Sequence, residues 1–578
     1  MDEFPRSRFC ALLAASAGTV SGCNFVNRGT EFDTQTDEGD MTVVTTRKEL
    51  EAAFEDLSKG DTIRITDENA PYRTTEWLDI DVSGVTIVGP GVRNLVEPAE
   101  SATVGGIRVG HNSSCEEIDI RGVGFRGTPG SGANDAERLH GIAARNANNV
   151  TVERNYIRRT YPVRHGDGGS AISVSRKCSD VRIANNQIHE FGDRGIQLAG
   201  QRVVVFGNVV TEGLDRPIAC DLWYPDAKNR TAQSVSIFGN LVGDSVEGSL
   251  VGIARNDPMA SNEGYVSIFG NVGFGSHKSF CHVRGPNALR NISVQNNVSE
   301  QTTEDLETEE TEKFAGIAVD VEEGRNLSIK NNELYGYSGH GVHVNSDISE
   351  ITIQHNSIFD PGLSGIRLVG ANNGLVGGNL VARTDGVGIR LSRTANVVAK
   401  GNYLRRTGTA GIISGGANSP TGNDIADNYV VEGGGNAPEG KTRPAILVRD
   451  HGVRVRGNAV HQHDGPAIAE PESVEDNLYE GNWTDGDRPW RFVSSSTHTR
   501  GNTPPTGVHR GVTTGSGSNA ARVEFDRKYA RRPRLAYGRV GGGVRDVSYE
   551  TNDDGEFVAA KVTVRRDGAT LDVFVNEG

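Results

Sequence analysis

The sequence predicts an all-β fold, a right-handed parallel β-helix solenoid with a short N-terminal capping helix and a small C-terminal antiparallel β domain. Three observations support this prediction. An asparagine recurs after a short apolar strand, and a second strand of pattern Gly-Ile-x-Leu recurs in the same repeat. Glycine accounts for 74 of the 578 residues while 35% are hydrophobic, a balance that suits short strands and tight turns. A repeat architecture accommodates such a length in one unit.

Residues 1–23 are expected to be a signal peptide. Arg6 and Arg8 precede a short apolar run, and the tetrapeptide Val-Ser-Gly-Cys ending at Cys23 resembles a lipobox, which would make Cys23 the lipidated first residue. An ordinary signal peptide with an incidental Cys23 is the alternative. Residues 24–40 are polar and are expected to be a tether. We therefore expect an exported protein, either on the cell surface and attached to the membrane only through a lipid anchor, or extracellular.

Residues 41–505 are expected to form the solenoid, which opens with a helix. The segment from Arg47 reads as helical because its apolar residues lie on one face, namely Leu50, Ala53, Phe54 and Leu57. Such a helix would cover the otherwise open apolar end of the first coil.

The repeated asparagines predict the body of the solenoid. They recur at spacings of 22 to 35 residues, at Asn155, Asn186, Asn208, Asn240, Asn271, Asn297, Asn332, Asn356, Asn379, Asn402, Asn428 and Asn458. Alternating apolar residues would point into the core, and strands would stack coil on coil about 4.8 Å apart. We expect the asparagines to adopt the left-handed conformation at a tight bend and to stack into a hydrogen-bonded ladder, so their role is structural.

These repeats resemble the pectate-lyase-like superfamily of right-handed β-helices. The resemblance covers roughly residues 41–505. It extends to the start of the solenoid, where Gly60 to Ile63 reads Gly-Asp-Thr-Ile and is followed by Tyr72. The resemblance implies the fold, whereas activity has to be argued from the site.

The register of the coils also predicts free thiols. Cys115 and Cys178 take the same place with one whole coil between them, and Cys220 and Cys281 likewise have a coil between them. Two coils span roughly 10 Å, which exceeds the reach of a disulfide.

A candidate site is predicted where the outward residues of the Gly-Ile-x-Leu strands, Ala219 and Gly252, are small and leave a recess. The predicted catalytic residues around it are Arg194, Arg216, Asp221, Tyr224, His282 and Arg284. The predicted substrate-binding residues are His165, Asp167, Asp193, Asp215, Trp223, Arg255 and Asp257. Aromatic rings cover the apolar faces of sugars, and arginine pairs with carboxylates, so the pattern points to an acidic polysaccharide.

Two reaction routes stay open for this site. In β-elimination, arginine or a metal neutralises a uronate carboxylate while a base removes the adjacent proton. Hydrolysis needs two carboxylates, which Asp193, Asp215, Asp221 or Asp257 would supply. We expect a polysaccharide lyase first and a glycoside hydrolase or epimerase second. A non-catalytic surface protein that binds a glycan or another partner is the alternative from a different class.

The composition also limits which binding partners and cofactors can be expected. The net charge of −15 disfavours nucleic acid, which needs a basic footprint. The cofactor is unknown. Ca²⁺ is a candidate bound ion because Ser299 to Lys313 is acidic, although this segment lacks the glycine-turn spacing of a calcium loop. The sequence predicts no oligomeric state.

Residues 506–520 are expected to be a linker and residues 521–578 a small β domain. Strands are predicted at 522–525, 534–539, 544–550, 556–565 and 570–575, joined in part by hairpin turns. This domain would either close the end of the solenoid or bind carbohydrate.

Overall fold

The computed structural model describes residues 41–576 with internal gaps. The gaps are residues 93–94, 100–104, 128–139, 161–168, 223–233, 246–247, 256–264, 276, 286–288, 303–313, 417–420, 436–442, 464, 472, 486–489, 493, 495, 503–507, 514–519, 530–533, 541–543 and 565–569. Among the described residues, no helix is long and apolar enough to cross a membrane.

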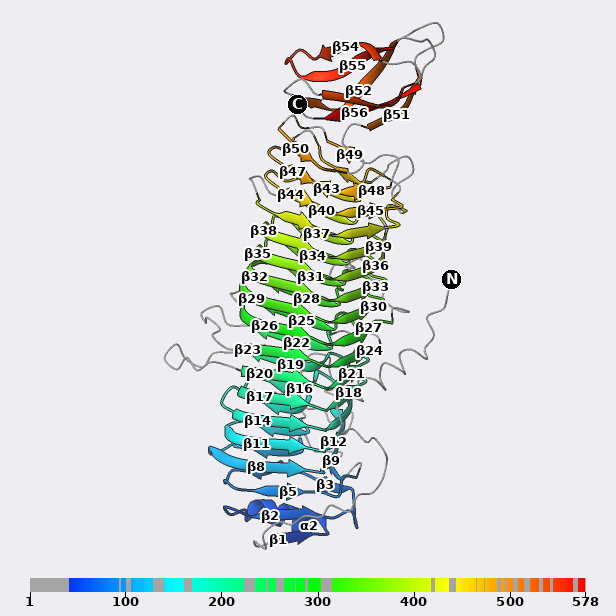
Figure 1. Ribbon diagram of the computed structural model, residues 1–578. Coiled ribbons are helices and arrows are strands. Elements are labelled where there is room, and N and C mark those ends of the chain that lie inside the picture. The colour runs from blue at the N-terminus through cyan, green and yellow to red at the C-terminus, as the bar shows by residue number, and fades with distance from the viewer. Residues whose placement is uncertain are drawn as a thin grey trace.

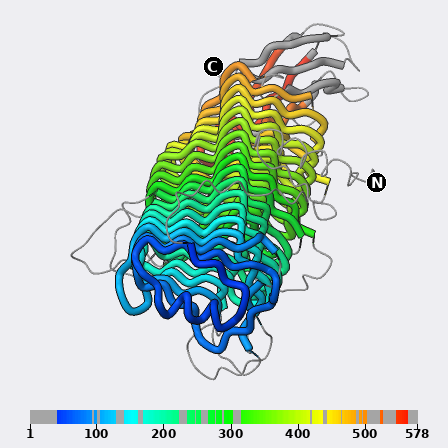
Figure 2. The backbone as a smooth tube through the Cα atoms, turned by 90° about the horizontal axis from the view of Figure 1, so that it is seen from below, coloured from blue at the N-terminus to red at the C-terminus, as the bar shows by residue number. Residues whose placement is uncertain are grey.

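The chain winds into a long solenoid whose coils stack like the turns of a spring (Figures 1 and 2). Three parallel sheets of 18, 16 and 16 strands run along it. Sheet A extends from β1 (Met41–Val44) to β50 (His498–Arg500), sheet B from β3 (Tyr72–Thr74) to β48 (Trp483–Thr484), and sheet C from β4 (Leu78–Ile80) to β49 (Trp490–Arg491). The predicted parallel β-helix is therefore confirmed.

Sheet C carries the Gly-Ile-x-Leu strands and positions the candidate site. Its relevant strands are β13 (Ser170–Val174), β16 (Arg194–Leu198), β19 (Arg216–Leu222), β22 (Val251–Arg255), β25 (Cys281–Gly285) and β28 (Ile317–Val321). In register, Gln197 pairs with Ala219, Ala219 with Gly252, and Gly252 with His282. Arg194 pairs directly with Arg216, so the predicted spacing of one coil is confirmed.

The asparagine ladder forms as predicted. The backbone N–H and Nδ2 of Asn155 donate to Oδ1 of Asn186, and the same two bonds link every following pair through Asn482 and Asn502. These side chains are buried, so their amides satisfy backbone groups that water cannot reach.

The expected left-handed conformation of the ladder asparagines is wrong. The residue immediately before each one turns the chain instead, with φ of 57° at Arg154, 56° at Asn185 and 65° at Gly207. Because the preceding residue makes the bend, the asparagine itself keeps an ordinary backbone conformation and turns its side chain inward.

The first coil is covered by the predicted helix, α2 (Arg47–Glu55). A capping box starts it, in which Thr46 Oγ1 accepts from Glu49 N–H at 3.3 Å and Glu49 Oε2 accepts from Thr46 N–H at 3.0 Å. Leu50 and Phe54 are buried and Ala53 and Leu57 are partly buried against the core, as predicted.

The four described cysteines are buried free thiols, as the register predicted. Cys115 and Cys178 both pair with the coil of Ala147, which lies between them. Burial raises the pKa of Cys115 to about 11, so this thiol stays protonated and packs as an apolar side chain.

The C-terminal part forms the predicted antiparallel β domain as two three-stranded sheets. One sheet contains β51 (Val508–Thr513), β56 (Thr570–Asn576) and β53 (Arg534–Val540), and the other contains β52 (Ala520–Tyr529), β55 (Phe557–Val564) and β54 (Val544–Thr551). Within the segment expected as a linker, 506–520, the structure places β51.

Candidate functional site

Three arginines gather on sheet C, from β16, β19 and β25. A Cβ added to Gly252 would lie 2.4 Å from Cδ of Arg216, so the aliphatic part of Arg216 lies across Gly252. The recess expected at Ala219 and Gly252 is therefore filled by this side chain. Because Gly252 pairs with His282, Arg216 extends from its own coil toward the coil of His282 and Arg284.

The carboxylates hold these arginines unequally. Arg194 Nη1 donates to Asp221 Oδ2 at 2.9 Å, and Asp221 is only 4% exposed. By contrast, Arg194 Nε lies 3.7 Å from Asp193 Oδ2, and Arg216 Nη1 lies 3.6 Å from Asp215 Oδ2, both beyond a normal hydrogen bond. Asp221 is thus committed to Arg194, whereas Arg216 has a looser internal counter-charge.

The pKa shifts in this cluster show that its arginines and carboxylates lie close together. Burial, together with the positive charges of Arg216 and Arg194, lowers the pKa of Arg284. Burial raises the pKa of Asp215 despite the opposing charge of Arg216. Arg194 and Arg216 are partly buried and Arg284 is exposed, so the three arginines repel one another, and an anion placed among them would relieve this repulsion.

His282 is held by a carboxylate on the next coil. Its Nε2 lies 3.1 Å from Asp320 Oδ2, and Asp320 stands in register with Arg284. Burial would raise the pKa of Asp320, but the hydrogen bond and charge of His282 outweigh it, so the pKa is lowered. In the neutral form of the ring, the nitrogen bonded to the ionised carboxylate carries the hydrogen, so Nδ1 of His282 is then the proton acceptor.

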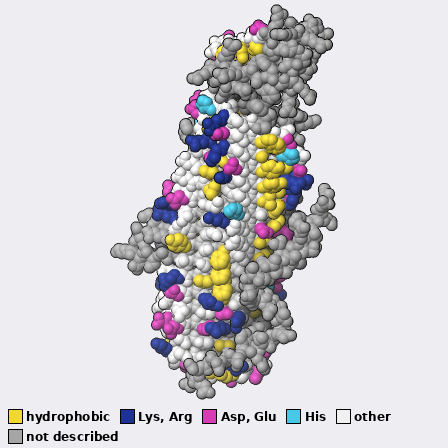
Figure 3. All heavy atoms as spheres, in the orientation of Figure 1, with side chains coloured by type: hydrophobic (Ala, Val, Ile, Leu, Met, Phe, Trp, Pro, Cys, Tyr) yellow, Lys and Arg dark blue, Asp and Glu magenta, His cyan; other side chains and the backbone are white. Residues whose placement is uncertain are grey.

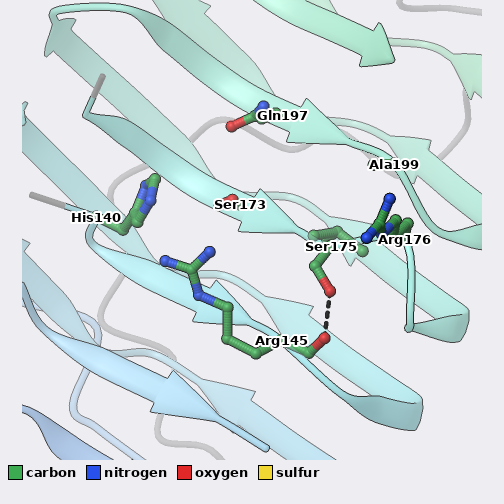
Figure 4. Close-up of a pocket in the computed structure, with 8 residues that line it drawn as sticks. His140, Arg145, Ser173, Ser175, Arg176, Gln197 and Ala199 are labelled. Atoms are coloured by element: carbon green, nitrogen blue, oxygen red, sulfur yellow. Dashed lines mark hydrogen bonds between the residues drawn. The ribbon is translucent and has the colours of Figure 1, made fainter. Parts of the chain in front are cut away.

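A pocket of about 270 Å³ continues the same face toward the N-terminus (Figure 4). Its lining residues are His140, Arg145, Ser173, Val174, Ser175, Arg176, Gln197 and Ala199. Gln197 connects it to the arginines, since its Oε1 accepts from Ser170 Oγ at 3.2 Å and its Nε2 donates to Asp221 Oδ2 at 3.1 Å.

The structure brings together most of the predicted site residues that it describes. Register or charge interactions link Arg194, Arg216, Asp193, Asp215, Asp221, His282 and Arg284. The backbone of Arg255 pairs with Leu222 in sheet C, but its side chain is outside the described residues. His165, Asp167, Trp223, Tyr224 and Asp257 also lie outside them, as does Cys23.

Sequence reasoning missed Asp320 and the basic pocket. The outward position of Gln197 and Ser173 in the strand register was the available signal for the pocket. Among the residues that the structure describes, no group of three or more His, Cys, Asp or Glu side chains could hold a metal ion. Most of the acidic segment considered for Ca²⁺ lies outside those residues.

A family model described as a right-handed β-helix region matches residues 104–228 and 287–460, more than half of the chain. The chain belongs to this right-handed β-helix family. A comparison with curated proteins gave no match.

Solved structures similar to this β-helix protein include carbohydrate-related ones. A PL6 alginate lyase in complex with a trisaccharide is 10% identical, with 81% of this chain and 84% of that chain covered and a TM-score of 0.25. The tailspike protein of E. coli bacteriophage HK620 in complex with a pentasaccharide is 11% identical, with 90% and 82% covered and a TM-score of 0.33. The catalytic unit of a GH87 α-1,3-glucanase from Streptomyces thermodiastaticus is 12% identical, with 80% and 68% covered and a TM-score of 0.33.

Proposed function

We propose that this protein is an exported carbohydrate-active enzyme that cleaves an acidic polysaccharide by β-elimination. One observation carries the proposal. Arg216 lies over Gly252, whose register partner is His282, and its charge acts on Arg284, which stands two residues from His282 on β25. Asp320 orients His282 through a 3.1 Å hydrogen bond. A cationic pair that can hold a carboxylate next to an oriented proton acceptor is the arrangement that elimination from a uronate requires.

The arginines and His282 carry out separate parts of the elimination. Arg216 and Arg284 bind the uronate carboxylate and stabilise the negative charge that spreads onto it as the neighbouring C5–H proton leaves. Nδ1 of His282 accepts that proton. The electron pair of the C–H bond forms the C4–C5 double bond while the bond from C4 to the glycosidic oxygen breaks. The departing oxygen takes a proton, and Tyr224 and His165 are the candidate donors among the residues predicted from the sequence.

The test is to incubate the purified protein with a panel of uronate polymers and to follow the absorbance of unsaturated ends. Arg216→Ala should abolish product formation without unfolding the solenoid, because an outward side chain contributes little to the core. Arg390→Ala, an outward arginine farther along sheet C, is the matched control. Equal effects of the two substitutions on activity and binding would show that the site lies elsewhere.

Hydrolysis is the second candidate, and the raised pKa of Asp215 favours it. Burial raises the pKa of the Asp215 carboxyl, and a raised pKa is what the general acid of a glycosidase needs. In that case the polymers would yield new reducing ends without unsaturated products, and Asp215→Asn would stop the reaction. Binding of a polymer with neither product would identify a non-catalytic glycan-binding protein.

A further inference from the structure

A stripe of apolar side chains runs along the outer face of sheet B, from β18 (Val209–Thr211) to β48. One outward position on successive coils is occupied by Val209, Leu241, Val272, Val298, Glu333, Ser357, Leu380, Tyr403, Tyr429, Ala459 and Trp483. Only Glu333 and Ser357 interrupt this column, which we call the sheet B stripe. Figure 3 shows hydrophobic side chains gathered over the C-terminal strands of sheet B.

The C-terminal half of the stripe is exposed to solvent. Tyr403, Tyr429 and Trp483 are 39%, 38% and 41% exposed. The other outward position of the same strands adds Tyr335 and Phe359, which pair in register. Large apolar side chains that adjoin one another on a surface are unfavourable in water and mark a place where another molecule binds.

The arrangement of the rings does not suit a sugar. The rings of Tyr335 and Phe359 are stacked, with centroids 5.1 Å apart and planes 10° apart. The centroids of Tyr403 and Tyr429 are 5.5 Å apart on neighbouring coils. The ring faces are therefore turned toward neighbouring coils, whereas a sugar packs on an open ring face. The ring edges that point outward form a surface suited to other apolar side chains.

The charges beside the stripe do not suit a strongly charged partner. Along one edge, Arg383 forms an ion pair with Asp360. Beyond the asparagine ladder, along the other edge, Arg456 forms an ion pair with Asp424. Ion pairs of this kind leave little net charge to attract an anionic membrane or an acidic polymer.

The period and size of the stripe fit a second copy of this chain. Coils follow one another about 4.8 Å apart, so the stripe presents ridges at that period. A second copy has the same period, and its side chains can enter the spaces between ridges at every coil. Ten coil spacings give a length of about 48 Å. With a width of about 12 Å, two copies would bury on the order of 1,200 Å² in total, which reaches the range of specific interfaces.

We propose that two copies of this protein associate side by side through the sheet B stripe, as a two-fold symmetric dimer. Tyrosine and tryptophan are the residues that contribute most to such interfaces. Sheet C is a separate face of the solenoid, so the candidate site stays open in both copies. The dimer does not depend on the proposed reaction.

The first experiment measures molar mass by sedimentation equilibrium over a wide range of protein concentration. All proteins carry Cys23→Ser, which excludes association through a lipid. The reference protein should reach twice the mass of one chain. Tyr403→Lys/Tyr429→Lys should raise the dissociation constant at least about a hundredfold, because it buries charges in the interface. The matched control is Tyr265→Lys/Phe269→Lys on β23 (Tyr265–Phe269) of sheet A, where the replaced side chains are 62% and 38% exposed.

A second measurement avoids the added charges. Ala459→Cys places a thiol within the stripe, and Ala395→Cys places one on sheet A as a control. The four described native cysteines are buried. Labelling of Ala459→Cys by a maleimide should slow as the protein concentration rises through the dissociation constant, while labelling of Ala395→Cys stays constant.

Each contrary result excludes the dimer for a stated reason. A molar mass of one chain at every concentration overturns it. A dimer weakened equally by the sheet A control, or by that control alone, places the interface elsewhere. Protection of Ala459→Cys by an added neutral polysaccharide or by lipid vesicles, without a change in mass, assigns the stripe to that ligand instead. Circular dichroism of both lysine variants checks that they are folded.

Discussion

At the scale of single residues, the side chain of each ladder asparagine makes hydrogen bonds to the coils before and after its own. Nδ2 of Asn240 donates to the backbone oxygens of Val205 and Phe238, both at 3.1 Å, and to Oδ1 of Asn271 at 2.9 Å. Its Oδ1 accepts from both nitrogens of Asn208. A carboxylate would lack the donors and an apolar side chain would lack both functions, so asparagine is required at each position.

Asn240→Ala should therefore lower the free energy of unfolding by about 2 to 4 kcal/mol, because it leaves several buried groups without partners. Chemical denaturation followed by circular dichroism measures this loss. The exposed Asn148 supplies a control, and Asn148→Ala should change the stability by no more than about 0.5 kcal/mol. Similar losses in the two variants would contradict a structural role for the ladder.

A second prediction at this scale concerns Gly252, whose hydrogen leaves room for Arg216. Gly252→Ala should displace the guanidinium of Arg216, because the new methyl group would lie 2.4 Å from its Cδ. We expect polymer binding to weaken about tenfold or more while the solenoid stays folded. Gly435→Ala, at a position with open space around it, is the control. Unchanged affinity in Gly252→Ala would show that the position of Arg216 does not matter.

At the scale of the elements, the interior between β24 (Val272–Phe274) and β25 contains a polar cluster. His277 is fully buried, and its Nδ1–H donates to the oxygen of Gly275 at 2.8 Å. Its Nε2 therefore accepts from the hydroxyl of Tyr337 at 3.1 Å, and that oxygen accepts from Ser299 Oγ at 2.6 Å. Burial lowers the pKa of His277 to about 4, so the folded protein contains the ring in its neutral form.

This pKa predicts a pH dependence of stability. The folded pKa of His277, about 4, lies below the unfolded value of 6.5. As pH falls below 6.5 the unfolded state therefore takes up a proton that the folded state does not. The free energy of unfolding is highest above pH 6.5 and decreases as pH falls toward 4. The loss should approach about 3 kcal/mol. Unfolding free energies of wild type and His277→Asn, measured from pH 7 to pH 4, should converge as pH falls. His498→Asn, at an exposed histidine, should stay parallel to wild type, and a constant gap for His277→Asn would refute the assignment.

The elements also show how far sequence could predict this molecule. The register of Arg194 and Arg216 was predictable because asparagines and alternating apolar residues mark each coil. The course of the Arg216 side chain over Gly252 was not, since it depends on packing between coils. The pocket was missed because Arg145 and Arg176 follow their strands in the corner between sheets C and A, where no periodic residue marks the chain.

At the scale of the whole molecule, the predicted lipid anchor at Cys23 would attach the protein by the end that α2 covers. Cys23→Ser should move the exported protein from the membrane fraction to the medium, because the acyl chains that bury in the bilayer are lost. Fractionation followed by mass spectrometry of the N-terminus measures this. Exported protein that retains Met1 would rule out the anchor.

The asparagine ladder also gives the solenoid a net dipole along its axis. In the sheets, N–H groups point both ways along the axis, as when Leu78 donates to Gly106 on the following coil and Gly110 donates to Ile80 on the preceding one, so their dipoles largely cancel. Each link of the ladder instead runs from the nitrogens of one asparagine to the oxygen of the next toward the C-terminus. Aligned amide dipoles add, and the positive pole faces the C-terminal coils. The proposed polysaccharide ligand also has two unlike ends, so we expect the two directions in which it could lie along the solenoid to differ in binding energy.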